Sequence, residues 1–157
     1  MIDVAGFIKK NKKKQITFMV WFYTGVFRLL IFFLPMKYLK KHFGIEGEES
    51  KEEAKIEQYR YAKMISDYVN RSSNHTLWES KCLVRALTAQ KLLNRKQIDS
   101  TLYLGVGKEE EKMIAHAWLR CGRMYVTGGD GSNYAIVAKY KMDYGEVDHI
   151  GEHGRIL

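Results

Sequence analysis

The residue of this chain best placed to do chemistry is a cysteine near the predicted start of a helix. Residues 78–94 predict that helix, because apolar side chains recur at three- and four-residue steps after Cys82, and Ser80 is of a type that caps helix N-termini. Backbone N–H groups point outward at such an end, and the helix dipole favours an anion there. We therefore expect the site to favour the thiolate form of Cys82, which is a nucleophile.

His116 is the residue that we expect to take the thiol proton. It lies in the sequence Ala115-His116-Ala117-Trp118, where the alternation predicts a strand, and its small neighbours leave room for a helix start to approach. If the two residues meet, the imidazole takes the proton of Cys82, the thiolate attacks an amide carbonyl, and the backbone N–H of Cys82 stabilises the oxyanion. A histidine alone on an apolar strand is more often structural, so only the pairing with the cysteine supports catalysis.

A third group should orient the imidazole, and Asp130 is the candidate. If the turn after the histidine strand is at Gly122-Arg123, antiparallel pairing puts His116 opposite residues 128–129, which are both glycines. Asp130 is the nearest carboxylate beyond them. The sequence supports equally the alternative that Asp130 only caps a glycine-rich turn.

Metal binding is a competing use of the same side chains, and the spacing does not favour it. Cys82, His116 and Cys121 offer suitable ligands, but no CxxC accompanies them, and strand alternation turns Cys121 away from the histidine. His149 and His153 have HxxxH spacing in a tail without a helical pattern. We expect neither a metal nor another cofactor.

The order of the predicted elements indicates an α+β fold. After the helical N-terminal region, residues 51–70 predict a second helix, and the cysteine helix follows. Strands are then predicted at 101–106, 114–121, 124–127 and 134–140. Short turns between these strands predict an antiparallel meander with the nucleophile helix packed on it.

The length of 157 residues fits one folded core. We divide the chain into residues 1–50, a basic and apolar helical region packed on or leading into the core, and residues 51–157, the enzyme domain. Residues 44–50 are polar and predict a linker between the two. Two cysteines do not make a disulfide scaffold, so we expect a reducing cytoplasm.

The positive charge is concentrated at the N-terminal end. The chain has a net charge of +8, and residues 1–41 carry nine lysines and arginines against Asp3 alone. An anionic partner should therefore meet this end first. No base-reading motif accompanies the lysines, so we do not expect nucleic-acid binding.

Residues 16–36 form the most apolar run of the chain, with Arg28 in its middle. The run has nearly the length of a membrane span, but an arginine at mid-span costs about 2.5–3.5 kcal/mol. It does not resemble a cleaved signal peptide, because no small-residue cleavage site follows. We expect a helix packed on the enzyme domain. Contact with a membrane surface is the second interpretation, and a true membrane span is the third.

Taken together, these motifs resemble the transglutaminase-like leader peptidases of lasso peptide biosynthesis, in the stand-alone form that works beside a separate leader-recognition protein. The resemblance covers about residues 70–140. It rests on four stretches: Trp78-x-x-x-Cys82-Leu83-x-Arg85-Ala86-Leu87, Leu102-x-x-Gly105-Val106, Ala115-His116-Ala117-Trp118-Leu119 with Gly122, and Val126-Thr127-Gly128-Gly129.

The resemblance implies a papain-like Cys-His-Asp protease in which Cys82 and His116 match the nucleophile and the base. Such an enzyme removes the leader from a ribosomally made precursor, so that a separate ATP-dependent cyclase can close the macrolactam. We therefore expect three partners: the precursor peptide, a leader-recognition protein and the lasso cyclase. Two positions depart from the family. Gly128 stands where many members carry the triad aspartate, and Gln97 replaces the usual glycine after the cysteine helix, which predicts a different turn.

Two other functions fit the same sequence. The first is acyl transfer to an amine on the same Cys-His scaffold, as in a transglutaminase-like enzyme. The second is a non-catalytic, membrane-associated scaffold protein that uses residues 7–41.

Overall fold

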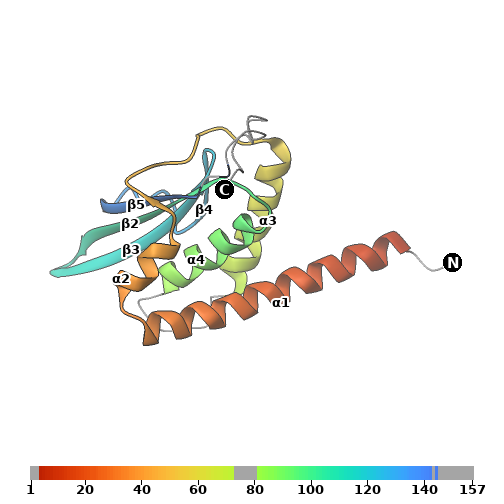
Figure 1. Cartoon of the computed structure of the whole chain (residues 1–157), viewed down its shortest axis with the longest axis horizontal. Helices are drawn as coiled ribbons and strands as arrows, with labels where there is room; N and C mark the ends of the chain where they lie inside the picture. Colours follow the sequence, from red (N-terminus) through yellow and green to blue (C-terminus); the bar gives the residue numbers. More distant parts are fainter. Residues whose placement is uncertain (1–3, 73–80, 143, 145–157) are drawn as a thin grey trace, which may run out of the picture.

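The computed structural model describes residues 4–72, 81–142 and 144 (Figure 1). Trp78, Ser80, His149 and His153 lie outside the described residues. The elements follow the order α1 (Val4–Phe33), α2 (Met36–Leu39), the 3₁₀ helix η1 (Lys40–His42), β1 (Ile45–Glu46), α3 (Ile56–Ser72), α4 (Lys81–Asn94), β2 (Ser100–Glu109), β3 (Lys112–Cys121), β4 (Met124–Thr127) and β5 (Ala135–Met142). Helices thus precede most of the sheet, and the predicted α+β class is confirmed. The predicted meander holds for β2, β3 and β4 but was wrong for the last strand, because β5 pairs with β2 and not with β4.

The strands form one antiparallel sheet in the order β1-β5-β2-β3-β4. Its inner face is covered by α4, which also contacts α1 and α3 (Figure 1). Strand alternation points Leu102, Leu119 and Tyr140 toward these helices, where all three side chains are buried. The opposite, outer face of the sheet carries Tyr103 and Trp118, which pair across β2 and β3.

The segment predicted as a linker, residues 44–50, contributes a strand to the sheet. Ile45 and Glu46 of β1 pair with β5, and the backbone N–H of Ser50 donates to Thr101 Oγ1 at 2.8 Å. Gly44 permits this pairing, because its φ is 121° and a side chain there would meet the backbone carbonyl of Lys141. The linker prediction was wrong because two-residue strands carry too little pattern to be recognised.

The turn after α4 is a Schellman motif. The N–H of Ile98 donates to the carbonyl of Leu93 at 3.1 Å, and the N–H of Gln97 donates to that of Asn94 at 3.0 Å. Ile98 and Leu93 are both buried, which supplies the apolar contact of the motif. Gln97 has a φ of 54°, so a glutamine holds the left-handed conformation that glycine usually takes at this position.

By length and composition alone, the segment Lys9–Phe33 of α1 is able to cross a membrane. Only 11% of the most apolar 18-residue stretch of this segment is buried in the protein. Side chains of its inner face, including Met19, Val20 and Tyr23, pack against the core, and Val20 is fully buried. This face of the helix therefore lies against the core of the protein.

We predict that Gln97→Gly raises the free energy of unfolding by about 0.5–1 kcal/mol. The left-handed conformation costs a side-chain-bearing residue about 1–2 kcal/mol, and the greater unfolded-state entropy of glycine offsets part of the gain. Urea denaturation of both proteins measures the difference. Lys96→Gly is the matched control, since Lys96 is exposed and does not have a positive φ. An equal gain at Lys96 would contradict the assignment.

Candidate active site

His116 lies on the outer face of the sheet, within a group of aromatic rings. Its ring stacks on Tyr134, with 4.4 Å between the centroids, and lies 5.8 Å from the ring of Trp118. Two glycines of β2 leave the space for these rings. A Cβ on Gly105 would lie 2.8 Å from the Trp118 ring, and a Cβ on Gly107 would lie 2.8 Å from the Tyr134 ring. The half-buried imidazole is therefore held in a defined plane.

A backbone carbonyl fixes one nitrogen of the imidazole. The Nε2 of His116 lies 2.6 Å from the carbonyl oxygen of Gly128, 12 residues further along the chain. A carbonyl can only accept, so Nε2 carries the hydrogen in this arrangement. In the neutral ring, Nδ1 is then unprotonated and able to accept a proton.

Gly128 is able to reach the histidine because it has no side chain. Its φ is 77°, and a Cβ there would lie 2.5 Å from the carbonyl oxygen of Ala117 and 2.8 Å from Cβ of Trp118. An aspartate at this position would meet both β3 and the left-handed backbone strain. Residue 128, where the resemblance predicts an aspartate, thus has a local backbone on which a carboxylate does not fit.

Asp130 is exposed, and its carboxylate bonds within its own turn. Oδ1 accepts a hydrogen bond from the backbone N–H of Ser132 at 3.0 Å, and this bond lowers the pKa of Asp130. The hydrogen bond of the His116 ring goes instead to Gly128. The contact observed for Asp130 is therefore the one that belongs to the turn-capping alternative.

Cys82 lies in the first turn of α4, half-buried, and packs against the inner core that includes Ala117. Both cysteines of the chain are thiols, not a disulfide. The structure leaves the thiol at the end of the helix where the dipole favours an anion, as the sequence predicts.

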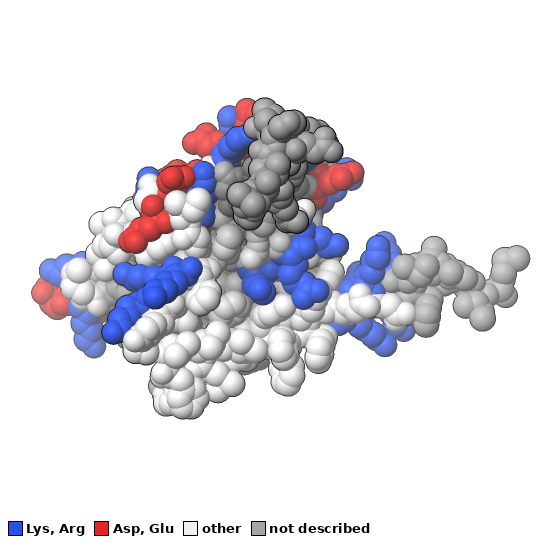
Figure 2. Space-filling view, in the orientation of Figure 1, with Lys and Arg blue, Asp and Glu red and all other residues white. Residues whose placement is uncertain are grey.

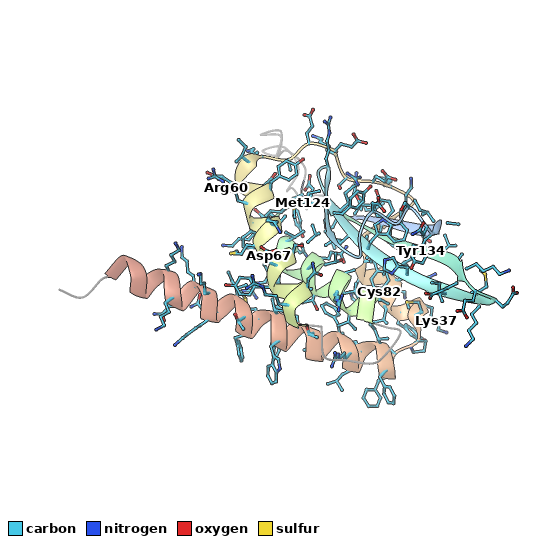
Figure 3. All side chains as sticks on the ribbon, turned by 180° about the vertical axis from the view of Figure 1, so that it is seen from behind. Lys37, Arg60, Asp67, Cys82, Met124 and Tyr134 are labelled. Atoms are coloured by element: carbon cyan, nitrogen blue, oxygen red, sulfur yellow. The ribbon has the colours of Figure 1, made fainter. Side chains whose placement is uncertain are left out.

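The length of α4 determines which part of the sheet Cys82 reaches. A helix of 14 residues is about 21 Å long, and β2 runs back along α4 in the opposite direction (Figure 1). A strand advances about 3.3 Å per residue, so the start of α4 lies level with about the sixth residue of β2. That residue is Gly105, whose partner on β3 is His116. Figure 3 shows Cys82 where α4 meets the sheet, at the same end of the molecule as Tyr134.

The two residues approach this level from different sides of β3. Cys82 belongs to the helix layer on the inner face, and His116 projects from the outer face. The last pair of the β3–β4 ladder is Leu119 with Thr127, so β4 does not pair with β3 at His116. In the described part of the chain, the ring of His116 contacts Gly128, Tyr134 and Trp118, and it makes no hydrogen bond to Cys82. The described contacts thus place the imidazole on the outer side of β3 and the thiol in the inner layer.

A groove of about 480 Å³ extends from Tyr134 over the outer face of the sheet. Its lining includes the stacked rings of Tyr103 and Trp118 and the guanidinium of Arg120. Arg120 is buried and donates to the hydroxyl of Tyr103 at 2.9 Å and to the carbonyl of Ser50 at 3.0 Å. These bonds hold residues around Ser50 against the sheet, so the groove has a fixed wall.

Two contributors to the site were not identified from the sequence as functional: the carbonyl of Gly128 and the ring of Tyr134. A backbone oxygen leaves no residue type to recognise, although the glycine opposite His116 was a signal that something approaches closely. Among residues 4–72, 81–142 and 144, no three histidine, cysteine or acidic side chains are grouped to hold a metal.

Comparison with known proteins adds one finding. A model of the transglutaminase-like superfamily matches residues 28–139, a segment that contains Cys82, His116 and Gly128. No curated protein and no solved structure matches the chain.

We predict that iodoacetamide labels Cys82 of the folded protein and spares Cys121. The side chain of Cys121 is fully buried, and this burial raises its pKa to about 11, so little thiolate is present. Mass spectrometry of peptides after brief labelling measures both sites, and labelling in denaturant is the control in which both should react. Faster labelling of Cys121 than of Cys82 in the folded protein would contradict the prediction.

Proposed function

The chain belongs to the transglutaminase-like superfamily, and on that premise we propose that it is a cysteine peptidase that removes the leader from a ribosomally made lasso peptide precursor. The superfamily supports a Cys-His enzyme scaffold in general. The observation that carries the proposal is the imidazole of His116, fixed by Gly128 and Tyr134 at the strand level that the start of α4 reaches. The lasso substrate is inferred from the resemblance of the motifs around Cys82 and His116.

In the proposed reaction, Nδ1 of His116 takes the thiol proton of Cys82, and the thiolate attacks the carbonyl carbon at the end of the leader. The backbone N–H of Cys82 donates to the oxyanion at the start of α4. When the C–N bond breaks, the imidazolium gives its proton to the leaving amine and a thioester remains. Water, deprotonated by His116, then hydrolyses the thioester. The products are a leader carboxylate and a core peptide with a free amine.

The carbonyl of Gly128 takes the orienting role that an aspartate has in related enzymes. It keeps the hydrogen on Nε2 and so leaves Nδ1 available for the thiol. A neutral carbonyl stabilises the imidazolium less than a carboxylate does, so part of the orientation falls to the stacked ring of Tyr134. In this proposal Asp130 only stabilises the turn between Gly128 and Tyr134.

The groove on the outer face suits an extended peptide next to His116. Its floor is aromatic, from Tyr103 and Trp118, and Glu49 and Arg120 add charges of both signs. A groove that is about 480 Å³ in volume holds only a few residues of peptide. Recognition of a whole leader then needs a second protein, which supports a separate leader-recognition partner. The free amine released by cleavage is the group that a cyclase would consume.

We predict that Cys82→Ala and His116→Ala each lower the rate of precursor cleavage by about 1,000-fold or more and leave the fold intact. Removal of the nucleophile or the base leaves only binding and oxyanion contributions. Mass spectrometry of the precursor, with the leader-recognition protein present, measures cleavage, and thermal unfolding checks the fold. Cys121→Ala is the matched thiol control and should still cleave.

The same assay separates hydrolysis from acyl transfer. Hydrolysis adds the mass of water to the leader fragment, whereas transfer adds the mass of an amine supplied in the buffer. Undiminished cleavage by Cys82→Ala would exclude the proposed chemistry, and an amine adduct as the main product would replace peptidase by acyltransferase.

The orienting group is tested by two neighbouring substitutions. We predict that Asp130→Asn keeps cleavage within about twofold of wild type, since an asparagine oxygen still accepts from the N–H of Ser132. Gly128→Ala should lower cleavage about tenfold or more, because the left-handed backbone must shift and take the carbonyl away from His116. A loss with Asp130→Asn that exceeds the loss with Gly128→Ala would return the orienting role to the aspartate.

A further inference from the structure

The helix α1 has two apolar faces, and the protein covers only one of them. The inner face packs against the core through Val20, Phe27 and Leu30, among others. The outer face exposes large side chains at helical spacing, and the most exposed are Phe18 (63%), Trp21 (73%), Leu29 (60%), Phe32 (80%) and Phe33 (71%). Figure 2 shows the surface along the lower edge of the molecule, over α1, as a band without charge.

Lysines stand at both ends of this band. Lys9, Lys10, Lys12, Lys13 and Lys14 precede Phe18 and are all exposed, and Lys37, Lys40 and Lys41 follow Phe33 and are also exposed. Residues 4–41 include no aspartate or glutamate. The surface thus has an apolar centre and two cationic ends, with no compensating negative charge on the segment.

We propose that the outer face of α1 binds the surface of a membrane that contains anionic lipids. Aromatic rings at the centre suit the boundary between headgroups and acyl chains, and the two lysine groups suit anionic headgroups on either side. The charge argues against a second copy of this chain as the occupant, because two such helices would bring together segments of the same sign. The inference is independent of the peptidase chemistry.

The packing of α1 determines how it lies on the membrane. A transmembrane orientation would remove Val20 from the core, where it is fully buried. It would also place Arg28, which is exposed and lies within the apolar stretch of the helix, near the centre of the bilayer. An orientation in the plane of the interface keeps the inner face on the protein and lets Arg28 reach the headgroups. The outer face then enters the lipid by about 5–10 Å.

Vesicle flotation of the full chain tests the proposal. The chain should float with vesicles of phosphatidylcholine mixed with phosphatidylglycerol, and about tenfold less with phosphatidylcholine alone. Phe32→Ser combined with Phe33→Ser should lower the bound fraction about tenfold on the anionic vesicles. The matched control is Met113→Ser combined with Val137→Ser, which removes two exposed apolar side chains from the strands and should bind like wild type.

Several results would overturn the proposal. These are no flotation of wild type with either vesicle, equal flotation with both, and an equal effect of the control variant. A stable dimer without lipid that dissociates in the Phe32/Phe33 variant would assign the face to a second copy. The depth of Trp21 in the membrane is measured by the quenching of Trp fluorescence with brominated lipids. The part of the quenching that is lost in Trp21→Phe belongs to this residue. Stronger quenching by bromines near the headgroups is expected, and stronger quenching by bromines at the bilayer centre would establish a span instead.

Discussion

The burial of α4 is the constraint on which the rest of the structure depends. Residues along its length, including Ala89, Leu92 and Leu93, are completely buried, because the sheet, α3 and α1 cover the helix from different sides. Burial fixes both its position and its rotation, and so its first turn delivers Cys82 to one level of β3. The same burial explains why the chain continues through a tight Schellman turn, with Gln97 left-handed, before β2 runs back along the helix.

Much of this arrangement could be predicted because it follows from periodicity. The cysteine helix, the histidine strand and the hairpin turn at Gly122-Arg123 each show a local pattern, and the structure has all three. The short strand β1 could not be predicted, because a two-residue ladder depends on where β5 lies and not on its own residues. The prediction of a different turn at Gln97 was wrong, because the fold imposes there the left-handed backbone that the residue type argued against.

The group that orients His116 in the candidate site also could not be predicted from residue types. The third member of a triad is predicted from the sequence as a side chain, and Asp130 was the nearest carboxylate. The structure instead presents a backbone oxygen at 2.6 Å from Nε2 of His116. Glycine at residue 128 is what allows that approach, since any Cβ there would collide with β3. An apparently missing residue can therefore indicate that the main chain itself makes the contact.

The two faces of α1 have different roles, one in the core and one at the surface. Its inner face cannot be made polar, because α4 would then lose the cover that holds Cys82 in place. Its outer face has no such role in the core, and yet it exposes large apolar side chains, which favours a second apolar environment. Because the helices cover the inner face of the sheet and the groove beside His116 opens on the outer face, a chain bound to lipid through α1 turns this groove away from the membrane (Figure 1). Under the two proposals above, the groove then faces the side from which a water-soluble partner brings the peptide.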